Sequence, residues 1–282
     1  MLGVNPKKIY IIAKKEFMDN IRSKWILLIS VIFIILTIVS AYVAGGSTDE
    51  VFGGVEATVV SLMSIYVVLI PLIAIMLGFS TIAGEAEAGS LSVVLSYPIK
   101  RVEVLLGKFL GLGSVLAVTP IIGFGFSGLV IVAVIGAEEG LAFLAFIALA
   151  IVLGLIYLSL IMCISALAKT RVRAIAGGVA LFFWSMIYGM IVMALYIGTG
   201  GDIQGFVTGQ VVYPEWLFAT TVVSPGDLNS MAVMKAFGIN QAMGVSVEPP
   251  GWMTMPFLLI IQLLWIIIPL FLAYYFFKKR DI

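Results

Sequence analysis

The segment "GEAEAGSLSVVLSYPIKRVEVLLGK", residues 84–108, lies between two long apolar runs and combines charged residues with a short amphipathic stretch. Gly89 interrupts any helix that continues from the preceding run. The following residues 90–96, "SLSVVLS", predict a short helix whose apolar side carries Leu91, Val94 and Leu95. Pro98 ends this helix, because the residue before a proline avoids helical geometry. We therefore expect a short transverse helix within a polar loop between two long apolar helices.

The composition indicates that a lipid bilayer surrounds these apolar helices. Of the 282 residues, 62% are hydrophobic and 11% are charged, whereas about a quarter of the residues of a soluble domain are charged. A transmembrane helix needs roughly 20 mainly apolar residues. The stretches that meet this requirement predict six transmembrane helices, at residues 25–44, 57–83, 104–135, 141–168, 174–198 and 252–277. The expected fold is an all-α, polytopic membrane protein with both termini on the same side.

The positions of Lys and Arg predict which side that is. Every basic residue except Lys235 precedes the first span, follows the sixth, or lies between spans two and three or four and five. The remaining loops carry Asp and Glu instead. Because loops that remain in the cytoplasm are enriched in Lys and Arg, both termini are predicted to be cytoplasmic. The expected location is the cell membrane, with the lipid bilayer as partner.

Residues 5–25, "NPKKIYIIAKKEFMDNIRSKW", predict an amphipathic helix at the membrane surface. Asn5 is suited to cap a helix and Pro6 to occupy its first position. One face of this helix would carry, at helical spacing, Tyr10, Ala13, Phe17 and Ile21. The alternative is an unstructured basic tail that only orients the first span.

Residues 199–255 form a long stretch between the fifth and sixth spans, on the predicted outer side. Their aromatic and apolar content argues against disorder. The apolar run at residues 216–223 is too short to cross a bilayer. We expect this extracytoplasmic loop to be either a small external subdomain or a segment lying on the membrane surface.

The side chains argue against chemistry within the chain. There is no histidine, and the single cysteine, Cys163, provides neither a disulfide nor a thiolate metal site. The central parts of the predicted spans hold no ionisable residue, which argues against an ion-coupled carrier. Residues 104–109, "VLLGKF", end like a phosphate-binding loop, but Val102 and Phe109 replace its glycine and its Ser or Thr. We expect no enzymatic activity, no cofactor, no metal site and no nucleic-acid partner.

The loop at residues 84–101 has the character of a docking surface for a soluble partner. Glu85 and Glu87 lie on one flank of its predicted helix, and Lys100 and Arg101 lie on the other. An apolar centre with a polar rim is the usual anatomy of a protein interface. The alternative is a plain interfacial loop without a partner.

These residues resemble the first cytoplasmic loop of ABC-2-type permeases, whose pattern is G-E-x-E-x-G-[ST]-L, then Y-P-[IL], R and L-L-G-K. The similarity extends to "SLMSIYVVLIPLIAIMLGFSTIAGE", residues 61–85, and to "IAKKEFMDNIRSKW", residues 12–25. Within this class the chain is most similar to the NosY-type permeases associated with nitrous oxide reductase maturation. The outer loop is the part that matches least.

The resemblance implies that residues 1–282 form a single transmembrane domain that pairs as a dimer and docks separate ATPase subunits, which bind ATP and Mg²⁺. Residues 5–25 would be the elbow helix, and residues 90–96 the main coupling helix within the coupling loop 84–101. The implied ATPase-coupling residues are Glu85, Glu87, Gly89, Leu91, Leu95, Pro98 and Arg101, with a second contact at Lys169, Arg171 and Arg173. For the NosY branch, the resemblance also implies an extracytoplasmic partner at residues 199–255 and a role in copper-site assembly.

The resulting hypothesis is a homodimeric permease subunit of an ABC-2-type transporter, an exporter driven by ATP hydrolysis on a separate ATPase. The absence of ionisable residues from the central parts of the spans and of a phosphate-binding loop agrees with an external energy source. Two alternatives remain open. One is a membrane scaffold or assembly factor that transports nothing, and the other is a secondary carrier.

Overall fold

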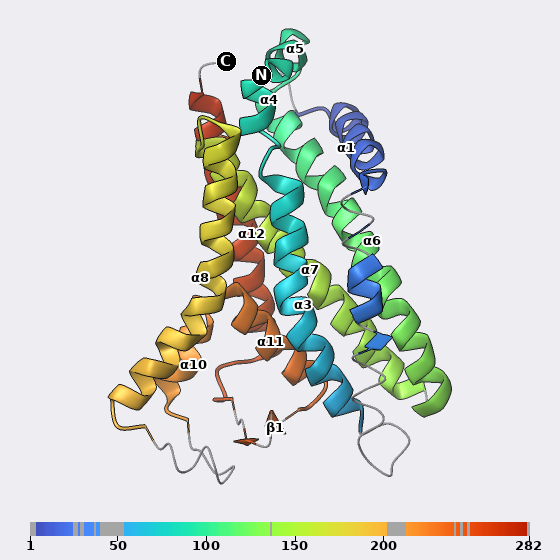
Figure 1. The fold of residues 1–282 in the computed structure, drawn as a ribbon, viewed down its shortest axis with the longest axis vertical. Helices are drawn as coiled ribbons and strands as arrows, with labels where there is room; N and C mark the ends of the chain where they lie inside the picture. Colours follow the sequence, from blue (N-terminus) through green and yellow to red (C-terminus); the bar gives the residue numbers. More distant parts are fainter. Residues whose placement is uncertain are drawn as a thin grey trace.

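The long helices of this chain lie side by side in a bundle (Figure 1). The computed structural model describes residues 4–24, 28, 31–36, 38–39, 54–135, 137–201, 213–239, 241–242, 245–246 and 249–280. The helices are α1 (Pro6–Ile21), α3 (Gly54–Gly78), α4 (Ala83–Glu87), α5 (Ser90–Ser96), α6 (Arg101–Ile135), α7 (Ala137–Leu167), α8 (Arg171–Gly198), α10 (Glu215–Thr221), α11 (Pro225–Ala236) and α12 (Met255–Lys279). The strands described are β1 (Gln241–Ala242) and β2 (Val245–Ser246), which form an antiparallel pair.

Within the described part of the chain, five helical segments are long and apolar enough to cross a membrane. They correspond to the predicted second to sixth spans, and they are Val59–Glu87, Arg101–Gly125, Phe143–Leu167, Arg171–Gly198 and Met255–Lys279. The predicted first span, residues 25–44, lies largely outside the described residues, so the count of six stays a prediction. Residues 31–36 are helical, and the ring of Phe33 packs against that of Phe124 in α6 with 5.1 Å between centroids.

The second predicted span, residues 57–83, ends earlier as a helix than the sequence indicates, because α3 stops at Gly78. The hydroxyl of Ser165 in α7 forms hydrogen bonds with backbone groups of the residues that follow Gly78. It accepts hydrogen bonds from the amides of Ile82 and Ala83, at 3.1 and 3.0 Å, and donates one to the carbonyl of Phe79 at 2.8 Å. A side chain from a distant part of the sequence thus replaces helical hydrogen bonds, which hydropathy cannot show.

Side-chain caps fix where several helices begin. The Asn5 side chain accepts from the amide of Lys7 at 3.0 Å and Pro6 occupies the first turn, so the predicted start of α1 is confirmed. Thr170, Ser224 and Thr254 cap α8, α11 and α12 in the same way. These caps fix the first residues of α1, α8, α11 and α12.

The packed core lies between α3, α6 and α7, with α12 on the other side of α7 (Figure 1). An aromatic cluster fills it, made of Phe33, Tyr66, Phe124 and Phe146, all fully buried. Neighbouring rings in the cluster meet edge to face, with centroids 4.7 to 6.2 Å apart. This arrangement is favourable for aromatic pairs and fixes how the three helices face one another.

Within the segment between α8 and α12, helix α11 differs from both sequence expectations. This helix is neither part of a separate external subdomain nor a surface segment, because it packs into the bundle against α7 and α12 (Figure 1). Leu228, Ala232 and Val233 of α11 are fully buried. The cause is that α11 carries apolar residues at helical spacing, and the bundle offers helices that cover them.

Candidate functional site

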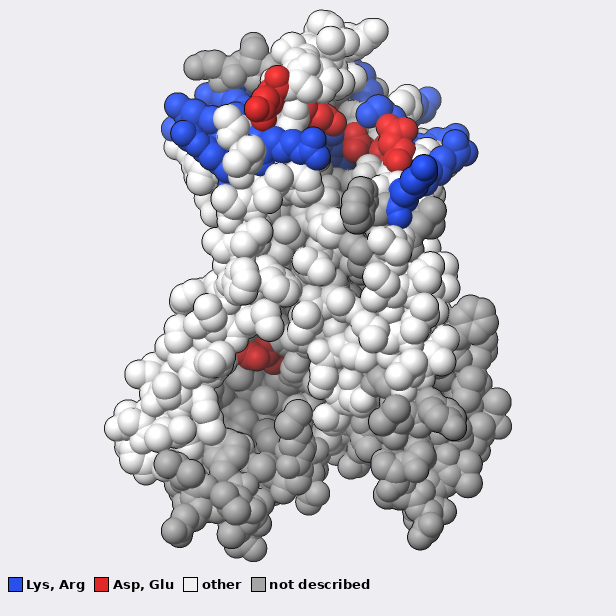
Figure 2. Space-filling model, in the orientation of Figure 1, with Lys and Arg blue, Asp and Glu red and all other residues white. Residues whose placement is uncertain are grey.

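Most of the charged residues that the structure describes gather at one end of the molecule, which we call the basic end. There Figure 1 places α1, α4, α5 and the end of α12, and Figure 2 shows Lys, Arg, Asp and Glu in a belt. Mostly uncharged atoms project beyond the belt, in the region that Figure 1 assigns to α5. The basic segments before the first span, between spans two and three, between spans four and five and after the sixth span therefore lie at the same end of the molecule.

The projecting helix α5 spans Ser90–Ser96, the residues that the sequence predicts to be helical. Gly89 precedes it with φ of 75°, a left-handed conformation that suits glycine, and this residue turns the chain between α4 and α5. Tyr97, in extended conformation before Pro98, ends the helix. The local chemistry of the loop thus decides the existence and limits of α5.

The apolar face of α5 points the other way from the docking surface that the sequence predicts. Leu91 is fully buried, and Leu95 is partly buried against the same core, so these side chains attach α5 to the bundle. The exposed large apolar side chains are Val93 and Tyr97, each 63% accessible. Periodicity identifies an apolar face without showing what covers it, and here the bundle covers Leu91 and Leu95. Their role in ATPase coupling stays a prediction.

A buried ion-pair cluster connects α5 and its loop to the rest of the molecule. The Nζ atom of Lys108 in α6 lies 2.9 Å from Oε1 of Glu16 in α1 and 2.5 Å from Oε1 of Glu85 in α4. The Lys108 side chain is only 3% exposed. One buried cation thus holds two carboxylates from different helices, which satisfies its charge in a poorly hydrated place.

Two glycines of α6 bring α1 close enough for this cluster to form. A methyl group at Gly111 would lie 2.5 Å from the carbonyl oxygen of Ala13, and one at Gly107 would lie 2.6 Å from Cβ of Ile12. These two glycines therefore form a small-residue contact with α1. Glu16 was missed by sequence reasoning, although a lysine beside closely packed glycines indicates that a carboxylate must lie nearby.

The second predicted contact segment, which contains Lys169, Arg171 and Arg173, lies directly beside the first. The amide of Arg171 donates to Oε2 of Glu87 at 2.7 Å, at the N-terminus of α8. A carboxylate is favourable at that position because the helix dipole is positive there. The guanidinium of Arg171 stacks over the ring of Phe79 at 5.3 Å, whereas the side chains of Lys169 and Arg173 are exposed. Residues 84–87 and 169–173 therefore form one continuous surface.

Two arginines cap the C-terminal ends of long helices at this end. Arg101 donates from one guanidinium nitrogen to the carbonyls of Phe277, Lys278 and Arg280 at the end of α12. Arg280 in turn donates to the carbonyls of Ala168 and Lys169 after α7, at 2.7 and 3.1 Å. Cations are favourable at helix C-termini. In this structure Arg101 is engaged with α12, so its predicted contact with a partner stays a prediction.

The remaining contacts connect the start of α1 to the start of α6. Glu103 accepts from the amide of Asn5 at 2.7 Å and from that of Lys100 at 2.9 Å. Lys8 donates to the carbonyl of Pro98. The loop between α5 and α6 is therefore held by the same helix α1 that contacts Lys108.

A second feature lies in the bundle away from the basic end. A cavity of about 240 Å³ is lined by residues of α3, α7, α8 and α11, among them Tyr157, Ser185 and Asp227. Figure 2 shows acidic atoms inside a hollow on this side of the molecule. Burial raises the pKa of the Asp227 carboxyl above its ordinary value. Within the described ranges, no three His, Cys, Asp or Glu side chains gather closely enough to hold a metal ion.

Several apolar spans with a charged belt at one end are the arrangement of a multi-pass membrane protein, and comparison with known proteins identifies its family. Residues 10–282 match the family model described as ABC-2 family transporter protein. The chain therefore belongs to the ABC-2 family of transporter proteins, and it is a multi-pass membrane protein.

Two relatives are similar over most of the chain, and both are called "Probable ABC transporter permease protein NosY". The protein from Stutzerimonas stutzeri is 32% identical over 283 residues, which cover 97% of this chain and 99% of the relative. The protein from Pseudomonas aeruginosa (strain PAO1) is 33% identical over 243 residues, which cover 84% of this chain and 85% of the relative. The similarity to NosY-type permeases that the sequence motifs indicate is therefore confirmed.

Proposed function

We propose that this chain is the transmembrane subunit of an ABC transporter and that a separate ATPase subunit docks on α4, α5 and the residues 169–173. The observation that carries the proposal is the exposure of Val93 and Tyr97 on a helix that projects beyond the charged belt (Figures 1 and 2). A small apolar centre with a charged rim suits a soluble protein partner. In this proposal the basic end, with both termini, is cytoplasmic, because Lys and Arg are retained on that side.

The contacts of α4 and α5 would transmit movement of the ATPase to the bundle. Glu85 is tied through Lys108 to α6 and α1, and Glu87 is tied to the start of α8. Leu91 is fixed in the core, so α5 cannot move without its neighbours. A push on α5 would therefore move α1, α6 and α8 together. We propose that this movement changes access to the substrate pathway, and that α1 acts as the elbow helix.

The test is to replace the exposed residues and leave the buried ones in place. The tagged chain is purified from its native membrane in mild detergent, and ATP hydrolysis and co-purifying ATPase are measured. Val93→Asp and Tyr97→Asp should each remove the ATPase, because a charge would be buried at the interface. The matched control is Val223→Asp, an exposed valine beyond α10, which should retain it.

The same experiment separates the proposal from its alternatives. Loss of ATPase without loss of the folded chain supports docking at α5. A chain that purifies without any ATPase, in the wild type as well as the variants, supports the membrane scaffold. Transport that follows an ion gradient and ignores ATP supports a secondary carrier. Leu91→Asp is unsuitable as a test, because it would disturb the core.

We further propose that the chain works as a homodimer. Helix α8 leaves several large apolar side chains uncovered in the single chain, including Phe183, Trp184 and Met190. A second copy would cover part of this face and thereby enclose a pathway between two bundles. Met190→Cys should form an intermolecular disulfide under oxidation if the α8 helices meet, whereas Leu110→Cys in α6 should not.

The resemblance to NosY-type permeases, which two relatives strengthen, supports a more specific proposal. In this proposal the transporter exports a component needed for assembly of the copper site of nitrous oxide reductase. The outer segment with α10 and α11 would then meet an extracytoplasmic partner. The test is the copper content of nitrous oxide reductase in cells that lack their own NosY-type permease and carry this chain. The wild type should restore copper loading and Val93→Asp should not; equal loading without any permease would contradict the proposal.

A further inference from the structure

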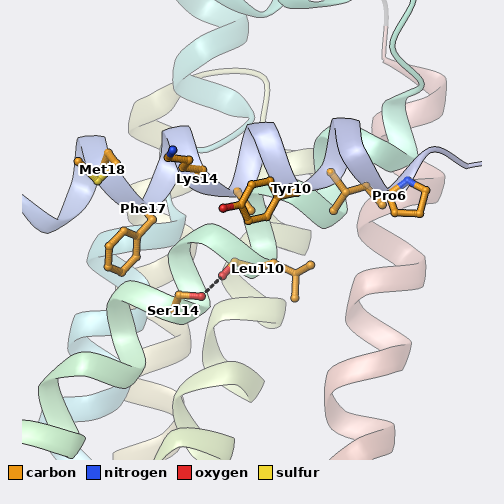
Figure 3. Close-up of a pocket in the computed structure, with 9 residues that line it drawn as sticks. Pro6, Tyr10, Lys14, Phe17, Met18, Leu110 and Ser114 are labelled. Atoms are coloured by element: carbon orange, nitrogen blue, oxygen red, sulfur yellow. Dashed lines mark hydrogen bonds between the residues drawn. The ribbon is translucent and has the colours of Figure 1, made fainter.

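An apolar groove runs between the amphipathic helix α1 and the transmembrane helix α6. It has a volume of about 780 Å³. Figure 3 shows the rings of Tyr10 and Phe17 extending from α1 on the side of Leu110 and Ser114 in α6. Figure 1 places α1 beside α6 at the basic end, so the groove lies close to the charged belt.

The wall of this groove is suited to hydrocarbon. The side chains of Ile9, Phe17 and Leu110 line it, and Leu110 is 52% exposed. The hydroxyl of Ser114 donates to the carbonyl of Leu110 at 2.7 Å, within α6 (Figure 3). The polar group on the wall is therefore satisfied inside its own helix, and an apolar occupant would not leave it unpaired.

The rim of the groove carries positive charge. Lys14 contributes to the lining and is exposed, and it forms no ion pair with any residue that the structure describes. The Nζ atom of its neighbour Lys15, in contrast, lies 3.5 Å from Oε1 of Glu16 and 3.4 Å from Oδ2 of Asp19. Figure 3 shows the Lys14 amine on the opposite side of α1 from Ser114. An occupant with its apolar part under α1 would meet this amine with its polar end.

We propose that the groove between α1 and α6 binds an anionic glycerophospholipid, with an acyl chain against Phe17 and Leu110 and the headgroup phosphate near Lys14. The charge complementarity with Lys14 and the position at the edge of the charged belt favour such a lipid over a second copy of the chain. A bound lipid would hold α1 against α6 and so support the contact between Glu16 and Lys108.

The test measures lipid binding by the purified full chain and does not depend on an ATPase. Dioleoylphosphatidylglycerol and dioleoylphosphatidylcholine are each titrated onto the delipidated protein, and bound lipid is counted by native mass spectrometry. The wild type should prefer phosphatidylglycerol. Lys14→Gln should lower this preference about fivefold, the effect expected for one basic residue near anionic lipid. Leu110→Trp, which fills the groove from an exposed position, should weaken the binding of both lipids.

The matched control for the charge is Lys278→Gln, an exposed lysine at the same end but on α12. It should leave the preference unchanged. The proposal is overturned if Lys14→Gln has no effect, or if Lys278→Gln lowers the preference as much. It is also overturned if Leu110→Trp leaves the binding of both lipids unchanged. If that variant instead changes its oligomeric state without losing lipid, the groove is a contact with a second copy of the chain.

Discussion

The two ends of this helix bundle are held together by different kinds of interaction. At the basic end, Lys108 bridges Glu16 and Glu85, and arginine side chains cap the ends of α7 and α12. At the opposite end, α11 packs against neighbouring helices mainly through apolar and neutral polar side chains. There the side chain of Asn229 donates to the carbonyl of Leu149 at 2.8 Å and to Gln262 at 3.2 Å, and accepts from the hydroxyl of Tyr66 at 2.7 Å.

The difference follows from the surroundings of each end. The ion-pair cluster lies next to a belt of exposed charges, so water is near. The desolvation cost of the Lys108 cation is therefore moderate, and two carboxylates offset it. The network around Asn229 lies among fully buried residues of α3, α7, α11 and α12, where neutral amides and hydroxyls cost less than ions to bury. The comparison predicts that removing a charge partner at the basic end is more damaging than removing a neutral partner at the other.

Removal of the central lysine should have the largest effect. Lys108→Met removes the buried cation that Glu16 and Glu85 share and leaves Glu16 only the exposed Lys15. We therefore expect a loss of about 3 kcal/mol in the free energy of unfolding. SDS titration of the purified chain in mixed micelles measures it. The control Lys15→Met removes an exposed lysine from α1 and should cost less than about 1 kcal/mol. Equal losses would show that the buried cluster does not hold the basic end together.

The close approach of α1 and α6 is tested by one added methyl group. Gly111→Ala places Cβ 2.5 Å from the carbonyl oxygen of Ala13, so α1 must move away. We expect a loss of about 2 kcal/mol in unfolding free energy, measured by the same titration. Gly125→Ala in the same helix meets no atom within 4 Å and should leave stability unchanged or slightly raised. A loss of similar size in both variants would place the effect in α6 itself and not in its contact with α1.

The neutral network at the opposite end is tested by Asn229→Leu, which keeps the volume and removes the amide. Tyr66, Gln262 and the carbonyl of Leu149 each lose a partner, and we expect a loss of about 1 to 2 kcal/mol. Asn20→Leu is the control, because the Asn20 amide makes one hydrogen bond, to the carbonyl of Glu16, and should cost less.

A double variant sharpens this result. Combining Asn229→Leu with Tyr66→Phe should cost less than the sum of the two single changes, because the two residues share a hydrogen bond. Strict additivity of the two losses would mean that the bond contributes nothing to stability. A loss at Asn229 larger than that of Lys108→Met would reverse the comparison between the two ends.

The smallest expected effect concerns the turn before α5. Gly89→Ala has free space around its new methyl group, so its cost comes only from the left-handed backbone conformation. We expect a loss of about 1 kcal/mol in the free energy of unfolding, as for other non-glycine residues in left-handed conformation. The same strain could instead loosen α5 locally, which faster amide exchange at residues 90–96 would show. Gly189→Ala in α8 also meets no atom within 4 Å and should show neither change.

Local chemistry explains which parts of the fold the sequence predicts well. Apolar runs of sufficient length give the positions of the second to sixth spans, and Asn5 with Pro6 gives the start of α1. Gly89 and Pro98 enclose α5, whose limits are set within ten residues of sequence. The roles assigned to the loop residues in ATPase coupling stay predictions, since they depend on a second protein.

The sequence by itself determined the membrane character of the protein, the grouping of basic residues on alternate loops and the existence of α5. Only the tertiary structure decided that Leu91 faces the core, that Lys108 joins Glu16 to Glu85, and that α11 enters the bundle. The physical reason is that hydropathy and helix-ending residues act over short stretches of chain. The partner of a buried charge or of an apolar face comes instead from a helix far away in sequence, and packing selects it.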